Sequence, residues 1–182
     1  MYYSVIAAGF GGQGIIQLGK ILAQCGMLSG LQVTCISSYG AEVRGGTANT
    51  TIIFSDRGIG SPVVTQPEGL IAMNALSFSR FIPAVKTGGD VLVNTSLIDL
   101  QQLPARDDLK MAKIAATGIA ESLGLVRTAN MVALGAFTAL TGLFPLDSAR
   151  QCVRDTFSSL PADLIKLNIS ALEQGYGQIK PL

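Results

Sequence analysis

The first stretch that could do chemistry is a glycine-rich run that reads G-F-G-G-Q-G at positions 9–14. A short apolar run at 2–8 precedes it, and apolar residues at helical spacing follow it from 15 to 28. A strand, a G-x-G-x-x-G turn and a helix can bind a diphosphate, because glycines allow close approach and the free N–H groups of the helix attract negative charge. We interpret this loop as a ligand or interface contact; the alternative is a purely structural turn.

Two common ligands of such loops are disfavoured. NAD binding needs an acidic residue at the end of the second strand, but the predicted second strand ends I-S-S at 36–38, and the first acid is Glu42 in the loop beyond. Domains that bind S-adenosylmethionine generally need such an acid too. Residues 14–21 match the spacing of a P-loop until Ile21, which cannot bind Mg²⁺. We therefore predict neither an NAD enzyme nor an NTPase, and we interpret Lys20 as a solvated helix residue.

A second polar loop follows the second predicted strand and reads S-S-Y-G-A-E-V-R-G-G-T at 37–47. Loops at the carboxyl ends of parallel strands share one edge of the sheet, so we expect it beside the first loop. Its candidate residues are Ser38, Tyr39, Glu42 and Arg44. The planar guanidinium of Arg44 suits a carboxylate or a phosphate. The alternative is that Glu42 and Arg44 form ion pairs with each other or with neighbouring loops. Glu42 alone, without a partner acid or base, is a weak candidate for catalysis.

The chain lacks most groups that catalyse reactions unaided. It has no histidine, which removes the commonest general acid–base and metal ligand. Its three cysteines, Cys25, Cys35 and Cys152, are widely spaced and indicate neither a disulfide framework nor a zinc or iron–sulfur site. We predict Cys25 and Cys35 to be core residues. No catalytic or metal-binding residue is therefore predicted in this chain.

The composition favours a protein that is part of a larger assembly. Of 182 residues only 14% are charged, against about 25% in typical soluble domains, and the net charge is +1. Partner proteins that cover an apolar surface would explain the low share of charged residues. The alternative explanation is a compact domain rich in glycine and alanine. Scattered basic residues argue against nucleic acid. We predict residues 128–146 to contain a buried helix that ends near Gly142, not a membrane span, and we expect a cytoplasmic protein without a signal peptide.

These loops need a scaffold of alternating strands and helices. Strands are predicted at 2–8, 31–37, 49–54, 70–73, 91–93 and 111–115, and helices at 15–28, 76–85, 118–123, 131–140, 146–158 and 162–173. This alternation is typical of an α/β fold. We predict one Rossmann-like domain over 1–182, with a mostly parallel twisted sheet and helices on both faces.

Three stretches resemble the gamma subunit, or gamma domain, of the 2-oxoacid:ferredoxin oxidoreductases. G-F-G-G-Q-G-I at 9–15 resembles the family's opening motif, and S-Y-G-A-E-V-R-G-G at 38–46 its second loop. N-M-V-A-L-G-A at 130–136 resembles its late helix. The likeness spans residues 3–140, and the three motifs together are far more specific than any one alone.

The resemblance implies a role within a multi-subunit enzyme. Such enzymes decarboxylate a 2-oxoacid on thiamine diphosphate, pass electrons through 4Fe–4S clusters to ferredoxin, and transfer the acyl group to coenzyme A. In the family, thiamine diphosphate, Mg²⁺ and the clusters belong to alpha and beta subunits, with or without a ferredoxin-like delta subunit. The gamma part packs against the thiamine-bearing subunits and is implicated in the coenzyme A side of the site. This chain by itself would bind none of these cofactors, and no thiamine signature of the G-D-G…N-N type occurs in it.

The family pattern carries over to individual positions. Five loop residues would face a phosphate or an interface, namely Gly9, Gly11, Gly12, Gln13 and Gly14. The adjoining wall would contain Ser38, Tyr39, Glu42 and Arg44, with Arg44 meeting either a coenzyme A phosphate or a partner's carboxylate. Two alternatives stay open: a stand-alone protein that binds a nucleotide or flavin, and an assembly module without a ligand. The isolated chain could also form a homodimer through surfaces meant for partners. The 2-oxoacid itself stays open.

Overall fold

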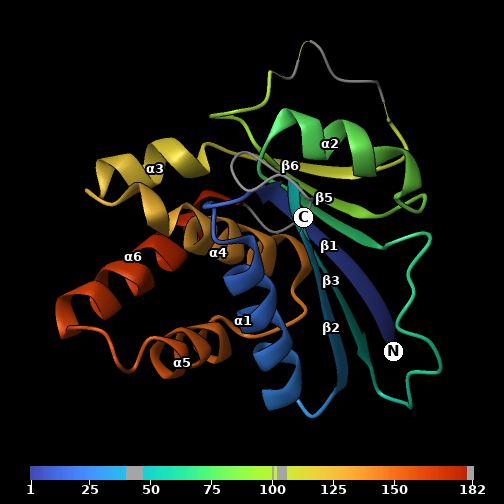
Figure 1. Cartoon of the computed structure of the whole chain (residues 1–182), viewed down its shortest axis with the longest axis horizontal. Helices are drawn as coiled ribbons and strands as arrows, with labels where there is room; N and C mark the ends of the chain where they lie inside the picture. Colours follow the sequence, from blue (N-terminus) through green and yellow to red (C-terminus); the bar gives the residue numbers. More distant parts are fainter. Residues whose placement is uncertain (40–46, 100, 102–105, 180–182) are drawn as a thin grey trace.

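A six-stranded sheet forms the centre of the computed structural model, which describes residues 1–39, 47–99, 101 and 106–179 (Figure 1). The strand order is β2-β3-β1-β4-β5-β6. All strands point the same way except β3, which runs antiparallel to β1 and β2. The predicted, mostly parallel α/β sheet is therefore confirmed. The bounds are β1 Tyr2–Phe10, β2 Gln32–Tyr39, β3 Thr47–Ser55, β4 Gly69–Ala72, β5 Asp90–Asn94 and β6 Lys110–Ile114.

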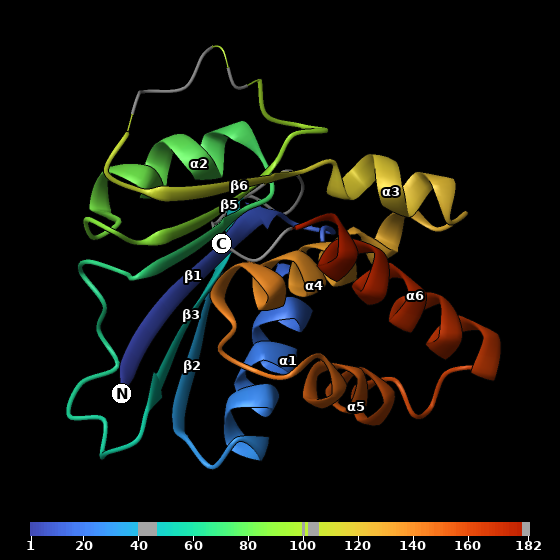
Figure 2. The same cartoon turned by 180° about the vertical axis from the view of Figure 1, so that it is seen from behind.

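Helices cover both faces of the sheet, as predicted, but unequally (Figure 2). In the described part of the chain, α2 and the short 3₁₀ helix η1 pack on one face, and the other helices share the core of the opposite face. There α5 packs on α1, and α6 packs on α4. The bounds are α1 Ile15–Leu28, α2 Ala75–Phe81, η1 Ile82–Ala84, α3 Ala116–Ser122, η3 Val126–Thr128, α4 Ala129–Thr141, α5 Leu146–Thr156 and α6 Ala162–Gln178.

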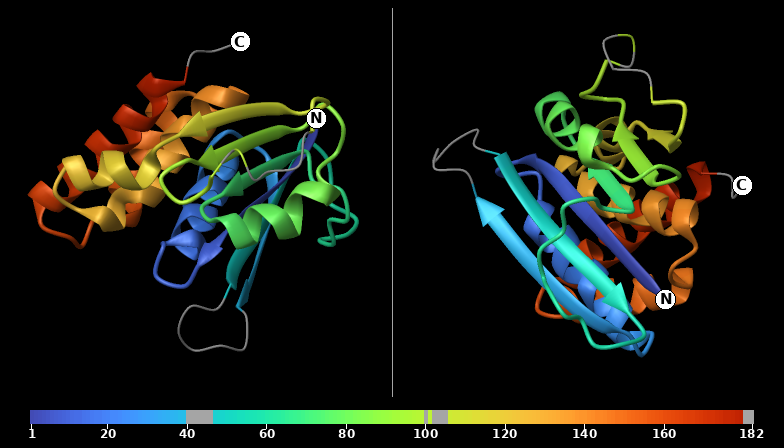
Figure 3. Two further views of the ribbon diagram at one scale, coloured as in Figure 1. Left: turned by 90° about the horizontal axis from the view of Figure 1, so that it is seen from above. Right: turned by 90° about the vertical axis from the view of Figure 1, so that its right-hand side faces the viewer.

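The central strand β1 shows why the sheet needs helices on both sides. Its residues from Ser4 to Ala8 are all buried. Val5 and Ala7 belong to the core beneath α1 and α4, whereas Ile6 and Ala8 belong to the core beneath α2. Successive side chains of a strand point to opposite faces, so all five residues are buried only if both faces are covered. Figure 3 shows the twist of the sheet and the helices beside it.

The long uncharged stretch near residue 130 forms the buried helix that we predicted. Residues 129–139 of α4 are all buried, and the helix ends at Gly142, whose φ of +59° is left-handed. Glycine adopts this conformation without the penalty that a Cβ brings. Among the described residues, no helix combines the length and the apolarity needed to cross a bilayer.

One expected core residue is at the surface. Cys35 was predicted to be buried because it lies in a strand, but its side chain is exposed. The reason is the position of β2 at the edge of the sheet, where β3 is its partner on one side only. Residues 35–39 of β2 are all exposed. A strand pattern in a sequence does not tell an edge strand from a central one.

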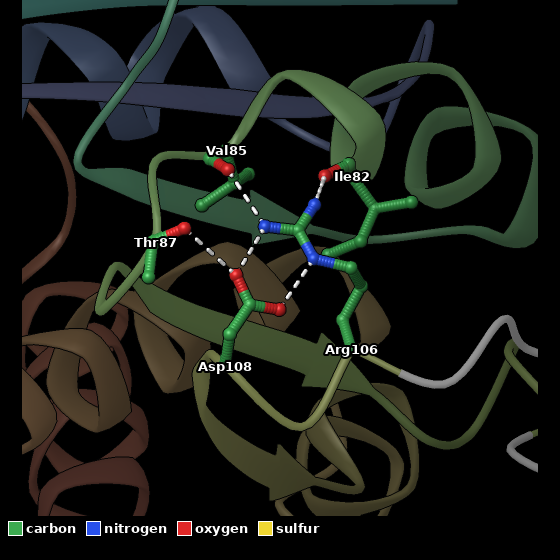
Figure 4. Close-up of polar contacts among 5 residues, drawn as sticks. All are labelled: Ile82, Val85, Thr87, Arg106 and Asp108. Carbon is green, nitrogen blue, oxygen red and sulfur yellow. Dashed lines mark hydrogen bonds and ion pairs between the residues drawn. The ribbon is translucent and has the colours of Figure 1, made fainter.

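On the α2 side, a cluster of polar contacts around Arg106 and Asp108 fixes the segment that leads into β6 (Figure 4). We call it the Arg106–Asp108 cluster. The Arg106 guanidinium donates to the carbonyl oxygens of Ile82 at 3.0 Å and Val85 at 2.9 Å. It also binds both carboxylate oxygens of Asp108, at 2.7 and 2.9 Å. The Thr87 hydroxyl donates to the same carboxylate at 3.1 Å. The bonds to Ile82 and Val85 tie the approach to β6 to both ends of η1, and the bidentate pair with Asp108 orients the guanidinium.

The contacts of the Arg106–Asp108 cluster should weaken in acid. Hydrogen bonds from Arg106 lower the pKa of Asp108 to about 2, below the value of about 3.9 for an unfolded aspartate. A lowered pKa stabilises the fold fully above the unfolded value and progressively less as pH falls towards the folded value. We expect Asp108→Asn to lower the melting temperature at neutral pH, and the difference from wild type to narrow from about pH 4 down to about pH 2. Thermal unfolding followed by circular dichroism would measure this.

The neighbouring carboxylate provides the control. Asp107 is exposed beside Asp108, so Asp107→Asn should follow the wild-type melting curve at each pH. A gap between wild type and Asp108→Asn that stays constant through acid pH would contradict the role given to the Arg106–Asp108 pair.

Candidate functional site

A pocket of about 430 Å³ lies where the glycine loop enters α1. We call it the Gly-loop pocket. Residues 10–12 and 14–17 line it from the loop and the first turn of α1. Tyr39 at the end of β2, Ala48 in β3 and Arg127 in η3 complete the lining. The carboxyl ends of β1 and β2, which run parallel on either side of β3, therefore meet at one pocket, as predicted.

The charges around the Gly-loop pocket favour an anion. The first N–H groups of α1 have no partners within the helix, and its first turn contains no acidic residue. Arg127 is exposed at the rim, and among the described residues no hydrogen bond or ion pair of its guanidinium is found. None of the described lining residues is acidic. A phosphate or carboxylate in this pocket would meet the helix N-terminus and one guanidinium.

Two left-handed glycines shape the loop. Gly12 has a φ of +93° and Gly14 a φ of +70°, a region that other residues enter only at a cost. Gly14 is also the N-cap of α1. A Cβ on Gly12 would meet open space, whereas a Cβ on Gly14 would lie 2.3 Å from the side-chain nitrogen Nδ2 of Asn130. Position 12 thus requires glycine for its backbone conformation alone, whereas position 14 requires glycine for both its conformation and the lack of space for a Cβ.

The Gln13 side chain is hydrogen bonded to the end of β1 and to the two residues that follow β4. Its Oε1 accepts from the N–H of Phe10 at 2.6 Å and from the side chain of Asn74 at 3.3 Å. Its Nε2 donates to the carbonyl of Met73 at 3.4 Å. Gly9 lies beneath this side chain, since a Cβ there would be 2.5 Å from Oε1. Gln13 and Gly9 therefore position the loop, and the ligand contact expected for them stays a prediction.

Asn130 connects the loop to the first turn of α4. Its buried side chain donates from Nδ2 to the carbonyl of Gly14 at 3.2 Å. The two residues are 116 positions apart in the chain. The sequence marked Asn130 only as part of a family motif, so this role was missed. The contact places the first and third motifs of the sequence against each other.

The second loop is described only at its start. Tyr39 is 72% exposed and lines the Gly-loop pocket, whereas Ser38 is exposed outside the lining. Glu42 and Arg44 lie outside the described residues, and their roles stay predictions. Of the seven predicted site residues that the structure describes, four line the pocket: Gly11, Gly12, Gly14 and Tyr39.

An apolar groove of about 400 Å³ continues from the pocket past Arg127. It shares Gln17 and Arg127 with the Gly-loop pocket. Its apolar wall consists of Leu125 just before η3, Phe157 and Leu160 between α5 and α6, and Leu164 in the first turn of α6. Arg127 therefore lies between the Gly-loop pocket and an apolar groove.

Sequence reasoning did not select Arg127. It belongs to no glycine loop, and in the sequence it is one of several scattered basic residues. The one available signal is its position three residues before Asn130, in the segment that leads into the third motif. Its place at the rim depends on η3 and α4 packing beside α1, which a motif search does not reveal.

Metal binding has no support in the described residues, where no three His, Cys, Asp or Glu side chains come together as ligands. Lys20, the lysine of the partial P-loop, is exposed on α1, as predicted.

Comparison with known proteins gives consistent matches along the chain. The family described as pyruvate ferredoxin/flavodoxin oxidoreductase matches residues 4–178. The ketoisovalerate oxidoreductase subunit VorA of Methanothermobacter marburgensis is 37% identical over 170 residues, which make up 92% of this chain and 34% of that protein. The 2-oxoglutarate synthase subunit KorC of Methanocaldococcus jannaschii is 35% identical over 177 residues, or 96% of this chain and 92% of that protein. The chain thus spans about a third of VorA and most of KorC.

Two solved structures share the fold. The gamma subunit of a keto/oxoacid ferredoxin oxidoreductase from Geobacter sulfurreducens has a TM-score of 0.80, with 30% identity and 97% of each chain covered. A 2-oxoglutarate:ferredoxin oxidoreductase from Magnetococcus marinus has a TM-score of 0.88 at 21% identity, and the match covers 100% of this chain and 32% of that one. At 21% identity the second match shows the fold alone. The chain therefore belongs to the pyruvate ferredoxin/flavodoxin oxidoreductase family, as a gamma-type subunit of a 2-oxoacid:ferredoxin oxidoreductase.

Proposed function

We propose that this chain binds the phosphate-bearing end of coenzyme A for the acyl-transfer step of its enzyme complex. The observation that carries the proposal is the Gly-loop pocket, which both the N-terminus of α1 and Arg127 line. Coenzyme A carries its negative charge on phosphates at one end, and a helix N-terminus with an arginine attracts such groups.

The shape of the site fits a long ligand with one charged end. The Gly-loop pocket takes about 430 Å³ and the adjoining groove about 400 Å³, and they meet at Gln17 and Arg127. A diphosphate in the pocket would leave an uncharged arm free to lie along Phe157 and Leu160 in the groove. Arg127 would bind the phosphate end, and the apolar wall would orient the arm.

The remaining cofactors are proposed for partner subunits. Thiamine diphosphate with Mg²⁺, held by alpha and beta subunits, would supply the chemistry that decarboxylates the 2-oxoacid. Clusters of the 4Fe–4S type there, or in a ferredoxin-like delta subunit, would pass the electrons to ferredoxin. This chain would bind and orient coenzyme A and complete the assembly. The relatives are named for different 2-oxoacids, ketoisovalerate and 2-oxoglutarate, so a panel of substrates must identify the one used.

Replacing Arg127 should weaken the use of coenzyme A. We expect Arg127→Ala to raise the KM for coenzyme A about tenfold, since a charge-assisted hydrogen bond contributes about 1.5 kcal/mol or more. The KM for the 2-oxoacid should not change. The measurement uses the complex purified anaerobically from the native host through a tag on this chain. Its subunits would be identified by mass spectrometry and its iron assayed, and turnover tested with several 2-oxoacids.

Arg57 supplies the matched control, because its side chain is 90% exposed near the end of β3 and outside the pocket. Arg57→Ala should leave both KM values unchanged. An intact Arg127→Ala complex with an unchanged KM for coenzyme A would refute the proposal. Loss of partner subunits from that variant would favour the assembly module instead. A wild-type chain that purifies alone with a bound nucleotide or flavin would favour the stand-alone protein.

A further inference from the structure

Two buried thiols meet between helices that are distant in the sequence. Cys25 in α1 and Cys152 in α5 are both 0% exposed. Their sulfur atoms are 3.2 Å apart and hydrogen bonded, and no disulfide joins them. Figures 1 and 2 show α5 lying beside α1. The widely spaced cysteines, which gave no disulfide pattern in the sequence, thus include one pair that the fold brings together.

The contacts around the pair keep α5 in register with α1. One turn beyond Cys152, the hydroxyl of Thr156 donates to Oε1 of Gln24 at 3.0 Å. Toward α6, Arg150 of α5 binds Glu173 at 2.7 Å. Bonds from α5 to both α1 and α6 therefore hold the two sulfurs near each other. A shift of about 1 Å would bring them to the length of a disulfide bond.

We propose that Cys25 and Cys152 form a redox-responsive dithiol that hydrogen peroxide converts to a disulfide joining α1 to α5. The Cys152 thiolate attacks one peroxide oxygen, which gives a sulfenic acid and releases hydroxide. Cys25 then attacks the sulfenic sulfur, and its proton leaves with the displaced hydroxide as water. In total, two thiols and one peroxide give one disulfide and two waters, so the oxidation of sulfur balances the reduction of peroxide.

The local chemistry supports this order of events. The hydrogen bond from Cys25 lowers the pKa of Cys152, and the same bond together with burial raises the pKa of Cys25. Cys152 therefore ionises first and is the better nucleophile. Burial excludes bulky oxidants, whereas hydrogen peroxide is close to water in size. Few residues of α5 are buried, among them Ala149 and Val153, so local opening of this outer helix provides access.

A disulfide at this position should stabilise the chain. It would connect residues 127 positions apart, and a covalent link across a long loop restricts the unfolded state strongly. We expect oxidation to raise the melting temperature by roughly 5–10 °C. Dithiothreitol should reverse the rise.

The test follows the mass of the full chain carrying Cys35→Ser, which removes the exposed third thiol. The protein is treated with millimolar hydrogen peroxide, quenched, denatured and alkylated. We expect the product to lose the mass of two hydrogen atoms, to gain no alkyl group, and to give a linked peptide pair containing Cys25 and Cys152. Reduction should restore two alkylation sites and the lower melting temperature.

Matched variants and the wild type make the result decisive. In the same background, Cys25→Ser or Cys152→Ser should give no disulfide within the chain. Wild-type Cys35 reports whether the oxidant acts on an exposed thiol. The proposal fails if Cys35 is oxidised while the pair stays alkylatable, or if the pair gains oxygen atoms without forming a link.

Discussion

Replacing Gly135 by alanine is expected to destabilise the chain by about 3 kcal/mol. Gly135 lies in α4, where a Cβ would be 1.9 Å from the carbonyl oxygen of Leu172 in α6. The contact is reciprocal, because a Cβ on Gly175 of α6 would be 1.9 Å from the carbonyl oxygen of Val132 in α4. Both obstacles are backbone atoms, so no change of rotamer relieves them and the helices must separate. The intrinsic gain of alanine over glycine in a helix, at most about 1 kcal/mol, is smaller than this cost.

A third glycine tests whether the crossing is responsible. Gly177 also lies in α6, but a Cβ there would meet nothing within 4 Å. Gly177→Ala should therefore be neutral or stabilise the chain by up to about 1 kcal/mol, whereas Gly175→Ala should behave like Gly135→Ala. Urea unfolding followed by far-ultraviolet circular dichroism measures all three. Equal stability of Gly135→Ala and wild type would show that α4 and α6 are free to move apart.

The same helix crossing matters for the site. α4 begins with Ala129, so Asn130 reaches the glycine loop from the first turn of the helix that Gly135 holds against α6. The two helices pack closely because both crossing positions lack a side chain. The third motif thus combines two physical roles, a buried amide that binds the loop and a glycine that fixes the helix. A displaced α4 would move Asn130 and with it the loop.

The elements of the fold were predictable because their signals are local. Apolar periodicity located the described strands and α-helices near their observed bounds, although it missed the short η3 and ended the last helix five residues early. Glycine and proline marked the turns. The glycine loop was predictable for the same reason, since strand, turn and helix are adjacent in the sequence. Even the meeting of Tyr39 with this loop followed from the rule that the carboxyl ends of parallel strands share an edge.

The features that escaped prediction depend on distant parts of the chain. The bond from Asn130 to Gly14, the Cys25–Cys152 contact and the place of Arg127 at the rim each need the packed structure. Cys35 was misplaced because exposure in a strand depends on its neighbours in the sheet, which the sequence of that strand does not contain. Local periodicity fixes elements, whereas long-range packing decides which side chains meet.

Replacing Gly14 by alanine is expected to impair both stability and the use of coenzyme A. Alanine at a φ of +70° costs roughly 1–2 kcal/mol, and its Cβ would lie 2.3 Å from Nδ2 of Asn130. We expect a total destabilisation of roughly 2–4 kcal/mol and a KM for coenzyme A raised more than that of Arg127→Ala. Urea unfolding of the chain and steady-state kinetics of the complex measure the two effects.

Gly30→Ala is the control, because Gly30 also has a positive φ, +76°, but lies at the other end of α1 with nothing within 4 Å of an added Cβ. This variant should lose stability and keep the wild-type KM for coenzyme A.

The clash itself can be isolated by removing its second partner. Asn130→Ala alone should destabilise the chain by about 1 kcal/mol, because the carbonyl of Gly14 loses its bond to the side chain. The same change leaves room for a Cβ at position 14. Once Asn130 is alanine, Gly14→Ala should therefore cost only its conformational strain. We expect the double variant to lose less free energy of unfolding than the two single variants lose together, by about 1 kcal/mol or more. Strictly additive free energies of unfolding would mean that Gly14 is required for its conformation alone, and that Asn130 does not position the loop through contact with it.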